Sequence, residues 1–300
     1  MKKNKAFTLI ELLVVIAIIG LLLSILIPAL TYVKEQSTAI LCQANLNGLG
    51  KAWILYIEEN NGFLVGGSTY NSTKYRWCER PLIPTSPIPL PENANPGTYE
   101  ANQGNGQLNS EARMRGIRAG FLFPYTESEK LYHCPNDKNY IKQDHPYKVY
   151  RTYAITGQMN GEDFRGDNNQ SVTIPGGNTR SFKMARKINN IDSPGMKHVY
   201  VEEDVVNSPV HGKQWHNLGG FVLMANSNYW SWWDIPAYYH NDRSTIGFAD
   251  GHAEKRTWKD PRTLYLMKNE PDPATGQVPG NVQTDNEDME YMNMAYFVSK

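Results

Sequence analysis

Residues 1–30 read MKKNKAFTLIELLVVIAIIGLLLSILIPAL and predict the longest element of the fold. A short basic segment leads to a junction at Ala6 and Phe7. One carboxylate, Glu11, then precedes an uncharged apolar run over residues 12–30. A helix needs about 20 apolar residues to cross a bilayer, so this run is long enough. The segment therefore predicts a single membrane-spanning helix.

An ordinary secretory signal peptide fits this segment poorly. Such a peptide has an apolar region of about 7 to 15 residues with a small-residue cleavage site after it. Here the run is longer, no such site follows it, and Glu11 lies inside the apolar region. A plain membrane anchor leaves Glu11 unexplained, because an acidic residue inside a membrane helix costs roughly 2.5 to 3.5 kcal/mol. We therefore expect Glu11 to have a partner and a function.

The stretch from Ala6 to the residue after Glu11, AFTLIEL, resembles the N-terminal signal of type IV prepilins and type II secretion pseudopilins. The resemblance implies that a prepilin peptidase cuts between Ala6 and Phe7 and methylates the new N-terminus. It also implies that Pro28 is the proline that bends the assembly helix. In a helical bundle, Glu11 of one subunit would meet the Phe7 amine of its neighbour and set the register between them. The family usually has Gly where this chain has Ala6.

The distribution of charge predicts how the chain lies across the membrane. Lys2, Lys3 and Lys5 favour a cytoplasmic N-terminus before processing, by the positive-inside rule. We therefore expect a single-pass protein of the inner membrane, with its globular part in the periplasm or on an extracellular fibre. The predicted organisation is a leader at 1–6, a transmembrane and assembly helix at 7–30, an amphipathic stalk helix at 31–60 and a globular domain at 61–300.

The stalk helix is predicted from apolar residues at an approximately helical spacing. They are Ile40, Leu41, Ala44, Leu46, Leu49, Trp53, Leu55 and Tyr56. The predicted fold class is α+β, with this long helix packed on an antiparallel β-sheet and with loop insertions. The clearest hairpin pairs residues 245–249 with 253–258 through Asp250-Gly251, a strong short-range hairpin signal. Residues 198–201 and 220–224 are further strand candidates.

Three cysteines, Cys42, Cys78 and Cys134, raise the question of a disulfide. One bridge is plausible in an oxidising compartment, and three single pairings exist. We favour Cys78–Cys134 because both residues lie in the globular part, whereas Cys42 lies on the stalk. A Cys42–Cys134 bridge stays open. No Cys-x-x-Cys occurs, so a zinc ribbon or a thioredoxin-like site is not expected.

His240 is followed by nine residues and then by Asp250-Gly251. This segment, 240–251, resembles the H-X9-DG domain, which occurs together with prepilin-type N-termini. A metal site made of His240, Asp242, Asp250 and His252 is a weak alternative, because imidazole and carboxylate suit transition metals. We favour a structural role, in which Asp250 bonds to the local backbone of the turn.

No cofactor is predicted, although calcium stays open. The run Glu202-Glu203-Asp204 follows a strand candidate and could supply the oxygen ligands that calcium prefers. Lysine plus arginine and aspartate plus glutamate balance at 30 each, and no basic run occurs outside the leader. Nucleic-acid binding is therefore not expected, because it rests on clustered positive charge.

The leading functional prediction is a non-enzymatic pilin-like subunit of a type II secretion pseudopilus or a type IV pilus-like fibre. Its expected partners are the prepilin peptidase, other pilin or pseudopilin subunits and an inner-membrane assembly platform. The alternative is a membrane-anchored surface protein that binds or hydrolyses carbohydrate and uses the pilin-type signal for delivery. Its ligand surface would be Trp230, Trp232 and Trp233, although we favour packing of these rings against the sheet.

Overall fold

The chain is described here from a computed structural model that covers residues 9–69, 75–88, 110–137, 151–161, 169–204, 220–223 and 229–297. The predicted processing junction, Ala6 and Phe7, lies outside these residues. The helices are α1 (Leu9–Glu59), α3 (Ser110–Arg118), α4 (Phe123–Thr126), α6 (Pro261–Lys268) and α7 (Glu287–Tyr296). The short 3-10 helices are η2 (Glu129–Tyr132), η3 (Ile188–Asn190) and η4 (Pro194–Met196). The strands are β1 (Tyr153–Ile155), β2 (Asn169–Thr173), β3 (Thr179–Lys183), β4 (His198–Glu202), β5 (Arg243–Phe248) and β6 (Ala253–Thr257).

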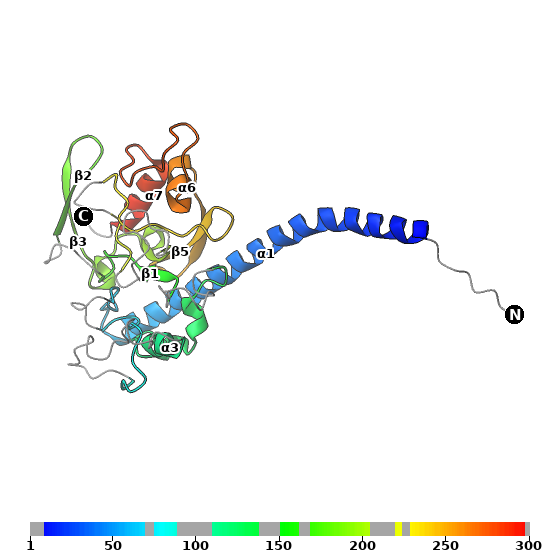
Figure 1. Cartoon of the computed structure of the whole chain (residues 1–300). Helices are drawn as coiled ribbons and strands as arrows, with labels where there is room; N and C mark the ends of the chain where they lie inside the picture. The colour runs from blue at the N-terminus through cyan, green and yellow to red at the C-terminus, as the bar shows by residue number, and fades with distance from the viewer. Residues whose placement is uncertain are drawn as a thin grey trace.

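Helix α1 is one continuous element of 51 residues, about 77 Å long at the usual rise of a helix. Its N-terminal part projects from the globular part of the protein, and its C-terminal part lies within it (Figure 1). We call this globular part, formed by the described residues after Glu59, the head. Pro28 lies inside the helix, where it removes one backbone hydrogen bond, and the projecting part is gently curved in Figure 1. The helix ends at Glu59, and Gly62 then donates its N–H to the carbonyl of Ile57 at 2.9 Å in a left-handed conformation.

The main sheet is antiparallel and has the strand order β1-β4-β5-β6. Its hairpin pairs Arg243 with Thr257 at one end and Gly247 with Ala253 at the other, so the predicted hairpin at Asp250-Gly251 is confirmed. The 198–201 candidate is also confirmed as part of β4. The candidate at 220–224 is not a strand over its described residues, where Phe221 forms only an isolated bridge with Thr156. A separate hairpin pairs β2 with β3.

The sheet separates two hydrophobic cores. One core lies between the sheet and the buried part of α1, and it contains Tyr153 and Ile155 from β1. The other lies against α6 and α7, and it contains Ala154 from the same strand. Successive residues of a strand point to opposite faces, so one strand can supply both cores. Figure 1 shows α1 on one side of the sheet and α6 with α7 on the other. The predicted α+β class, a long helix against an antiparallel sheet, is therefore confirmed.

The face of α1 that packs on the head differs from the predicted stripe. Its principal buried residues follow one another at intervals of three or four and are Ala39, Cys42, Leu46, Leu49, Trp53 and Tyr56. Four residues of the predicted stripe point outward: Ile40, Leu41, Ala44 and Leu55. Ile40 and Leu41 are 63% and 53% exposed. Apolar residues occur on several sides of this helix, so an approximate periodicity does not identify the side that the sheet covers.

A contact between two glycines fixes how closely α1 approaches the hairpin. A Cβ atom on Gly50 of α1 would lie 2.8 Å from the carbonyl oxygen of Gly251. A Cβ atom on Gly251 would in turn lie 2.9 Å from the Cδ1 atom of Ile54, and Gly251 has a φ of +91°. The glycine in the helix therefore lets the turn between β5 and β6 rest directly on the helix backbone.

Candidate assembly helix and a buried thiol–imidazole cluster

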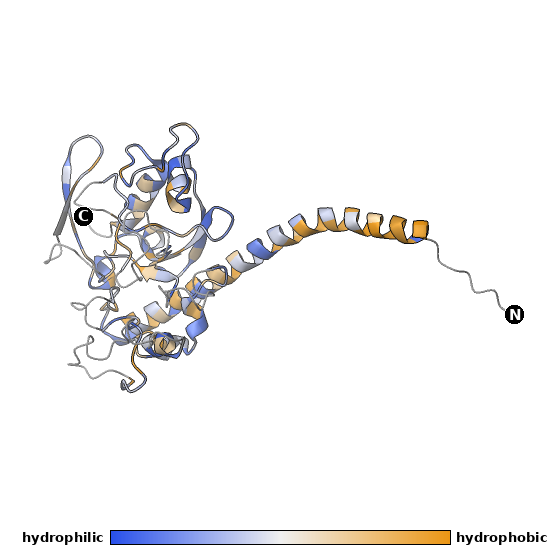
Figure 2. Cartoon of the chain, viewed as in Figure 1, coloured by the Kyte–Doolittle hydropathy of each residue, from blue (hydrophilic) through white to orange (hydrophobic). Residues whose placement is uncertain are grey.

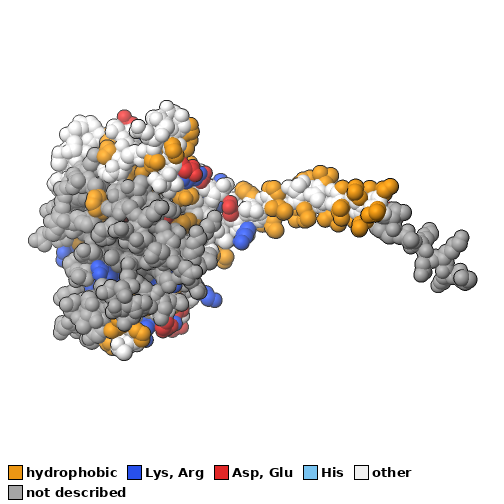
Figure 3. All heavy atoms as spheres, in the orientation of Figure 1, with side chains coloured by type: hydrophobic (Ala, Val, Ile, Leu, Met, Phe, Trp, Pro, Cys, Tyr) orange, Lys and Arg blue, Asp and Glu red, His pale blue; other side chains and the backbone are white. Residues whose placement is uncertain are grey.

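The projecting part of α1 is apolar on every side and is covered by none of the residues that the structure describes. Its described residues from Leu9 to Tyr32 are all exposed. An 18-residue window in α1 has a mean hydropathy of 3.1 and no buried residue. Among the described residues, α1 is the one helix long and apolar enough to cross a membrane. Figure 2 shows hydrophobic residues along this part of the helix, and Figure 3 shows charged side chains where it meets the head.

The sequence-predicted assembly residues lie on this projecting part. Glu11 is exposed in the first turn of α1, and Pro28 is about four to five turns further along the helix. The hydroxyl of Ser24 donates to the carbonyl of Leu21 at 2.7 Å, so this polar side chain is satisfied within its own helix. Apart from Glu11, the described residues from Leu9 to Val33 include no charged side chain. The structure therefore presents one acidic group within a long uncharged surface.

Polar contacts hold the C-terminal part of α1 in the head. Lys255 of β6 donates its Nζ to the side-chain oxygen of Gln36 at 3.0 Å. Asn45 donates its amide to the carbonyl of His133 at 3.0 Å. At the far end, the hydroxyl of Tyr125 donates to a carboxylate oxygen of Glu59 at 2.6 Å. The head therefore contacts α1 from about Gln36 to the end of the helix.

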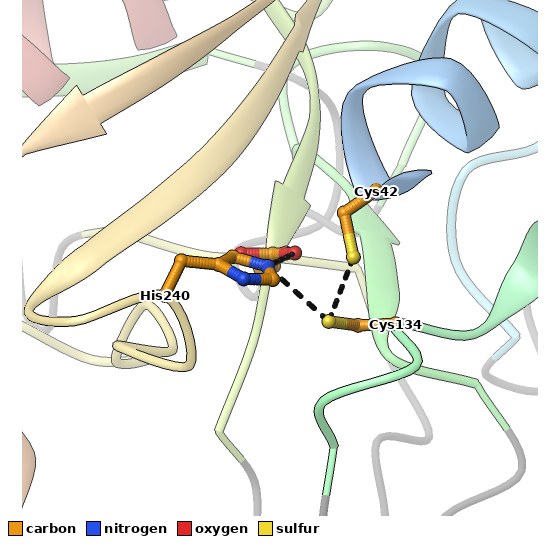
Figure 4. Close-up of side chains that lie close together, drawn as sticks. Cys42, Cys134 and His240 are labelled. Atoms are coloured by element: carbon orange, nitrogen blue, oxygen red, sulfur yellow. Dashed lines mark hydrogen bonds and ion pairs between the residues drawn. The ribbon is translucent and has the colours of Figure 1, made fainter. Parts of the chain in front are cut away.

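Four ligand-type side chains meet where α1 enters the head. They are Cys42 of α1, Cys134 after η2, Glu202 at the end of β4 and His240 before β5. The sulfurs of Cys42 and Cys134 lie 2.8 Å apart, and the Nε2 atom of His240 lies 3.3 Å from the Cys134 sulfur (Figure 4). The same Nε2 atom lies 3.1 Å from Oε1 of Glu202. All four side chains are buried.

The two thiols of this cluster have different environments. Burial alone would raise the pKa of Cys42, but the hydrogen bonds with Cys134 and His240 outweigh it and lower that pKa below its ordinary value. Burial, and then the contact with Cys42, raises the pKa of Cys134. Burial would lower the pKa of His240, but its contacts with Cys42 and Glu202 raise it to about 10. The imidazole is therefore held as a cation beside a carboxylate and a thiol of increased acidity.

The favoured disulfide, Cys78–Cys134, is wrong in this structure. All three cysteines are free, and the partner of Cys134 is Cys42. Cys78 is fully buried in the core beside α1, and burial raises its pKa to about 12. The argument from sequence separated the stalk from the globular part, whereas the head encloses the stalk at Cys42. The pairing left open, Cys42 with Cys134, is the one that the structure brings together.

The four weak metal candidates do not form one site. His240 is buried in the thiol cluster, whereas Asp242 makes an ion pair with Lys268 at 2.8 Å. Asp250 stays at the exposed turn, where it accepts from the backbone N–H of His252 at 3.1 Å and from its ring. This is the local turn role expected of Asp250. Gly251 of the same motif is the residue that rests on α1.

The acidic residues predicted to bind calcium do not all point to the same side of the strand. Glu202 points toward the thiol cluster, and its Oε2 atom accepts from the backbone N–H of Thr245 at 2.8 Å. Adjacent residues of a strand point in opposite directions, so Glu203 does not join it there. Calcium binding by Glu202, Glu203 and Asp204 stays a prediction.

The central residue of the predicted tryptophan surface is not at the surface. Trp232 is fully buried in the core beside α6 and α7, and its indole N–H lies 3.4 Å from the side-chain oxygen of Gln283. Trp230 and Trp233 are half-buried. A fully buried ring cannot stack on a sugar, so the three tryptophans do not form one exposed platform. The core interpretation of Trp232 is the one that its burial supports.

The cluster of Cys42, Cys134, Glu202 and His240 was missed from the sequence. Its members lie in four different segments of the chain, and Cys42 and His240 are separated by 198 positions (240 minus 42), so no local spacing predicts the cluster. One usable signal existed on α1. Cys42 continues the interval of three or four that links the buried residues of that helix, which would have placed it toward the sheet.

Comparison with known proteins gives results for the N-terminal region. A family model described as the prokaryotic N-terminal methylation motif matches residues 1–27. Over 63 residues, 21% of the chain, the sequence is 41% identical to the type IV wide pilus major component PilA4 of Thermus thermophilus. The matched stretch is 48% of that pilin, so the chain spans about half the length of this relative. No solved structure matches the chain.

These findings confirm the resemblance to prepilins that the stretch from Ala6 to Leu12 predicts. The resemblance of residues 240–251 to the H-X9-DG domain stays a prediction. The chain therefore carries the prokaryotic N-terminal methylation motif and is similar, over about a fifth of its length, to a type IV pilin.

Proposed function

We propose that this protein is a non-enzymatic pilin-like subunit that assembles through the projecting part of α1. In this proposal a prepilin peptidase removes residues 1–6 and methylates Phe7. The subunit then waits in the inner membrane with its head on the periplasmic side, and an inner-membrane platform adds it to a fibre of similar subunits. The fibre is a type II secretion pseudopilus or a type IV pilus-like structure.

The observation that carries this proposal is the exposure of a helix that bears the methylation motif and has no charged side chain apart from Glu11. Residues 9–30 present large apolar side chains on every side, and Leu9 is 86% exposed. Such a surface is stable only in a lipid bilayer or in a bundle of similar helices. Ile40 and Leu41 continue this apolar surface onto the outward side of the part held by the head. A bundle could therefore extend beyond the thickness of the membrane.

The role of Glu11 in the proposal follows from electrostatics. Processing creates a new amine at Phe7, and a neighbouring subunit displaced along the fibre can bring its Glu11 beside that amine. The pair offsets the desolvation of both charges. Removing one member of a buried ion pair costs about 3 to 5 kcal/mol. This penalty would make correct axial placement of each subunit a condition for assembly.

Intact-mass analysis of the protein from native membranes and from sheared surface material tests the processing step. We expect a chain that begins at Phe7 and carries one methyl group. Ala6→Leu should block processing because it enlarges the small residue before the cut, whereas Ala6→Gly should preserve it. A native chain that still begins at Met1 would contradict the proposal. Finding the processed protein in surface material would favour a pilus-like fibre, and finding it only in membranes would favour a pseudopilus.

Assembly is tested with Glu11→Gln, which keeps the size of the side chain and removes its charge. We expect normal membrane insertion and loss of incorporation into fibres when the variant is the only copy. Glu11→Asp is the matched control because it retains the carboxylate. Normal incorporation of Glu11→Gln would show that the acidic group does not set the register, and it would overturn this part of the proposal.

A further inference from the structure

We propose that Cys42, Cys134, Glu202 and His240 form a structural metal site that binds one zinc ion. Each of these residues offers one ligand atom, and the four atoms lie within 4.8 Å of one another. The side chains are almost completely buried, with Cys42 and Glu202 at 0% and Cys134 and His240 at 1% exposure. The site is independent of the assembly function proposed above.

The donor set matches the chemistry of zinc. Thiolate sulfur and imidazole nitrogen are its usual ligands, and a carboxylate oxygen is a common fourth. Calcium and magnesium prefer oxygen donors alone, so two sulfurs disfavour both. Four protein ligands leave no open position for a substrate, which is the pattern of a structural site.

The spacing of the four atoms fits an ion with a small adjustment. Bond lengths of about 2.3 Å for zinc to sulfur and about 2.0 to 2.1 Å for zinc to nitrogen place two sulfurs about 3.8 Å apart and a sulfur and a nitrogen about 3.5 Å apart in a tetrahedron. The Cys134 sulfur and Nε2 of His240 are already 3.3 Å apart. The sulfurs of Cys42 and Cys134, 2.8 Å apart, must separate by about 1 Å.

Backbone groups around the site hold the ligands in position. The N–H of Asn136 donates to the Cys134 sulfur at 3.4 Å, and the N–H of Cys134 donates to the hydroxyl of Thr152 at 3.0 Å. Glu202 uses Oε2 for the N–H of Thr245, which leaves Oε1 directed at His240 and the thiols. Such outer contacts orient ligands in metal sites.

A disulfide alone would not explain the whole arrangement. It would bring the two sulfurs to about 2.05 Å and would involve neither Glu202 nor His240. An ion explains why all four atoms converge, because its two positive charges offset most of the charge of a buried carboxylate and two thiolates. On binding, each thiol and the Nε2 atom of the His240 cation release a proton to solvent, and Nδ1 keeps the remaining proton of the ring.

Metal analysis of the full-length protein in detergent tests this proposal. The protein is stripped with a chelator, titrated with Zn²⁺ alone, and analysed by mass spectrometry for metal content. We expect one zinc per chain and a higher unfolding temperature with Zn²⁺. Cys42→Ser and His240→Asn should lose the bound zinc and the shift in unfolding temperature. Cys78→Ser is the matched control, because Cys78 is a buried thiol outside the cluster, and it should retain both.

A measurement on the unmodified chain keeps the test decisive if a variant does not fold. Co²⁺ in place of Zn²⁺ should give the charge-transfer absorption of cobalt bound to thiolate. Absence of this absorption would overturn the proposal, as would zinc that persists in both Cys42→Ser and His240→Asn. Alkylation of the denatured, unreduced native protein gives a third result. Modification of all three cysteines supports a metal site, whereas modification of Cys78 alone would show a Cys42–Cys134 disulfide and overturn it.

Discussion

The two parts of α1 have the same backbone and opposite surroundings. The projecting part, residues 9–30, is apolar on every side, and no other described segment covers it. The part held by the head buries one side, where Leu46, Leu49 and Trp53 are fully covered. An apolar helix surface can therefore be shielded from water in two ways. One part packs within its own chain, and the other requires a membrane or another subunit.

The largest expected effect is a difference in the free energy of unfolding between substitutions of two leucines on opposite sides of the helix. Leu46 is fully buried, whereas Leu41 is 53% exposed. Leu46→Ala should lower the free energy of unfolding of the head by about 2 to 5 kcal/mol, because it leaves a cavity. Leu41→Ala should change it by about 0.5 kcal/mol or less. Chemical unfolding in detergent checks both values, and equal effects would contradict the assignment of the buried side.

A pair of glycines tests the close approach of helix and hairpin. Gly50→Ala would put a Cβ atom 2.8 Å from the carbonyl oxygen of Gly251, a backbone atom that cannot turn aside. We expect a loss of about 1 to 3 kcal/mol in the stability of the head, although alanine is the better helix former. Gly20→Ala is the control, because nothing lies within 4 Å of its added Cβ. Unfolding curves for the two variants should differ, and a neutral Gly50→Ala would show that the helix can shift away from the turn.

A decrease in pH should lower the stability of the head through His198. Burial, with Lys197 and Arg256 nearby, lowers its pKa from 6.5 to about 3. Below pH 6.5 the unfolded chain takes up a proton that the folded chain excludes. His198 should therefore contribute a loss of stability of about 1.4 kcal/mol per pH unit as the pH decreases from 6.5 toward 3.

The variant His198→Phe removes the titratable imidazole and keeps a ring beside Phe248 and Tyr291. The slope of unfolding free energy against pH should become shallower in acid by that amount. Leu22→Phe, in the projecting part, is the control and should leave the slope unchanged. An unaltered slope in His198→Phe would assign the acid sensitivity to other groups.

The smallest expected effect concerns the entry of the helix into the head. Lys255 donates to Gln36 at 3.0 Å across this entry. Lys255→Met keeps much of the apolar stem and should lower stability by about 0.5 to 1.5 kcal/mol. Gln36→Leu should have a similar effect, and the double variant should not add to it if the two act only through this bond. Full additivity in the unfolding measurements would show that the hydrogen bond contributes nothing.

Local signals in the sequence were sufficient for the long helix and for the hairpin at Asp250-Gly251. A continuous apolar run and a turn dipeptide each act within a few residues, so they can be interpreted without the rest of the chain. The buried side of α1 was harder to predict because Ile40, Leu41 and Leu55 are as apolar as the residues that the sheet covers. Only the position of the sheet distinguishes them.

The thiol cluster could not be predicted for a different reason. Cys42, Cys134, Glu202 and His240 come together only after β4 has paired with β5 and α1 has packed on the sheet. The expected groupings, Cys78 with Cys134 and His240 with Asp250, followed proximity along the chain or membership of one predicted domain. Long-range packing determined the outcome, and it joined the stalk to the centre of the head.

The place where α1 enters the head has a mechanical consequence for any fibre built from this chain. Ala39 and Cys42 are the first fully buried residues of the helix along its sequence. We expect a pulling force along the projecting helix to reach Cys42 before Leu46 or Trp53. Because Cys42 lies beside residues from three other segments, that force would spread over the head at the first fully buried part of the helix. Single-molecule pulling on the N-terminus should therefore show a lower rupture force in Cys42→Ser than in Cys78→Ser.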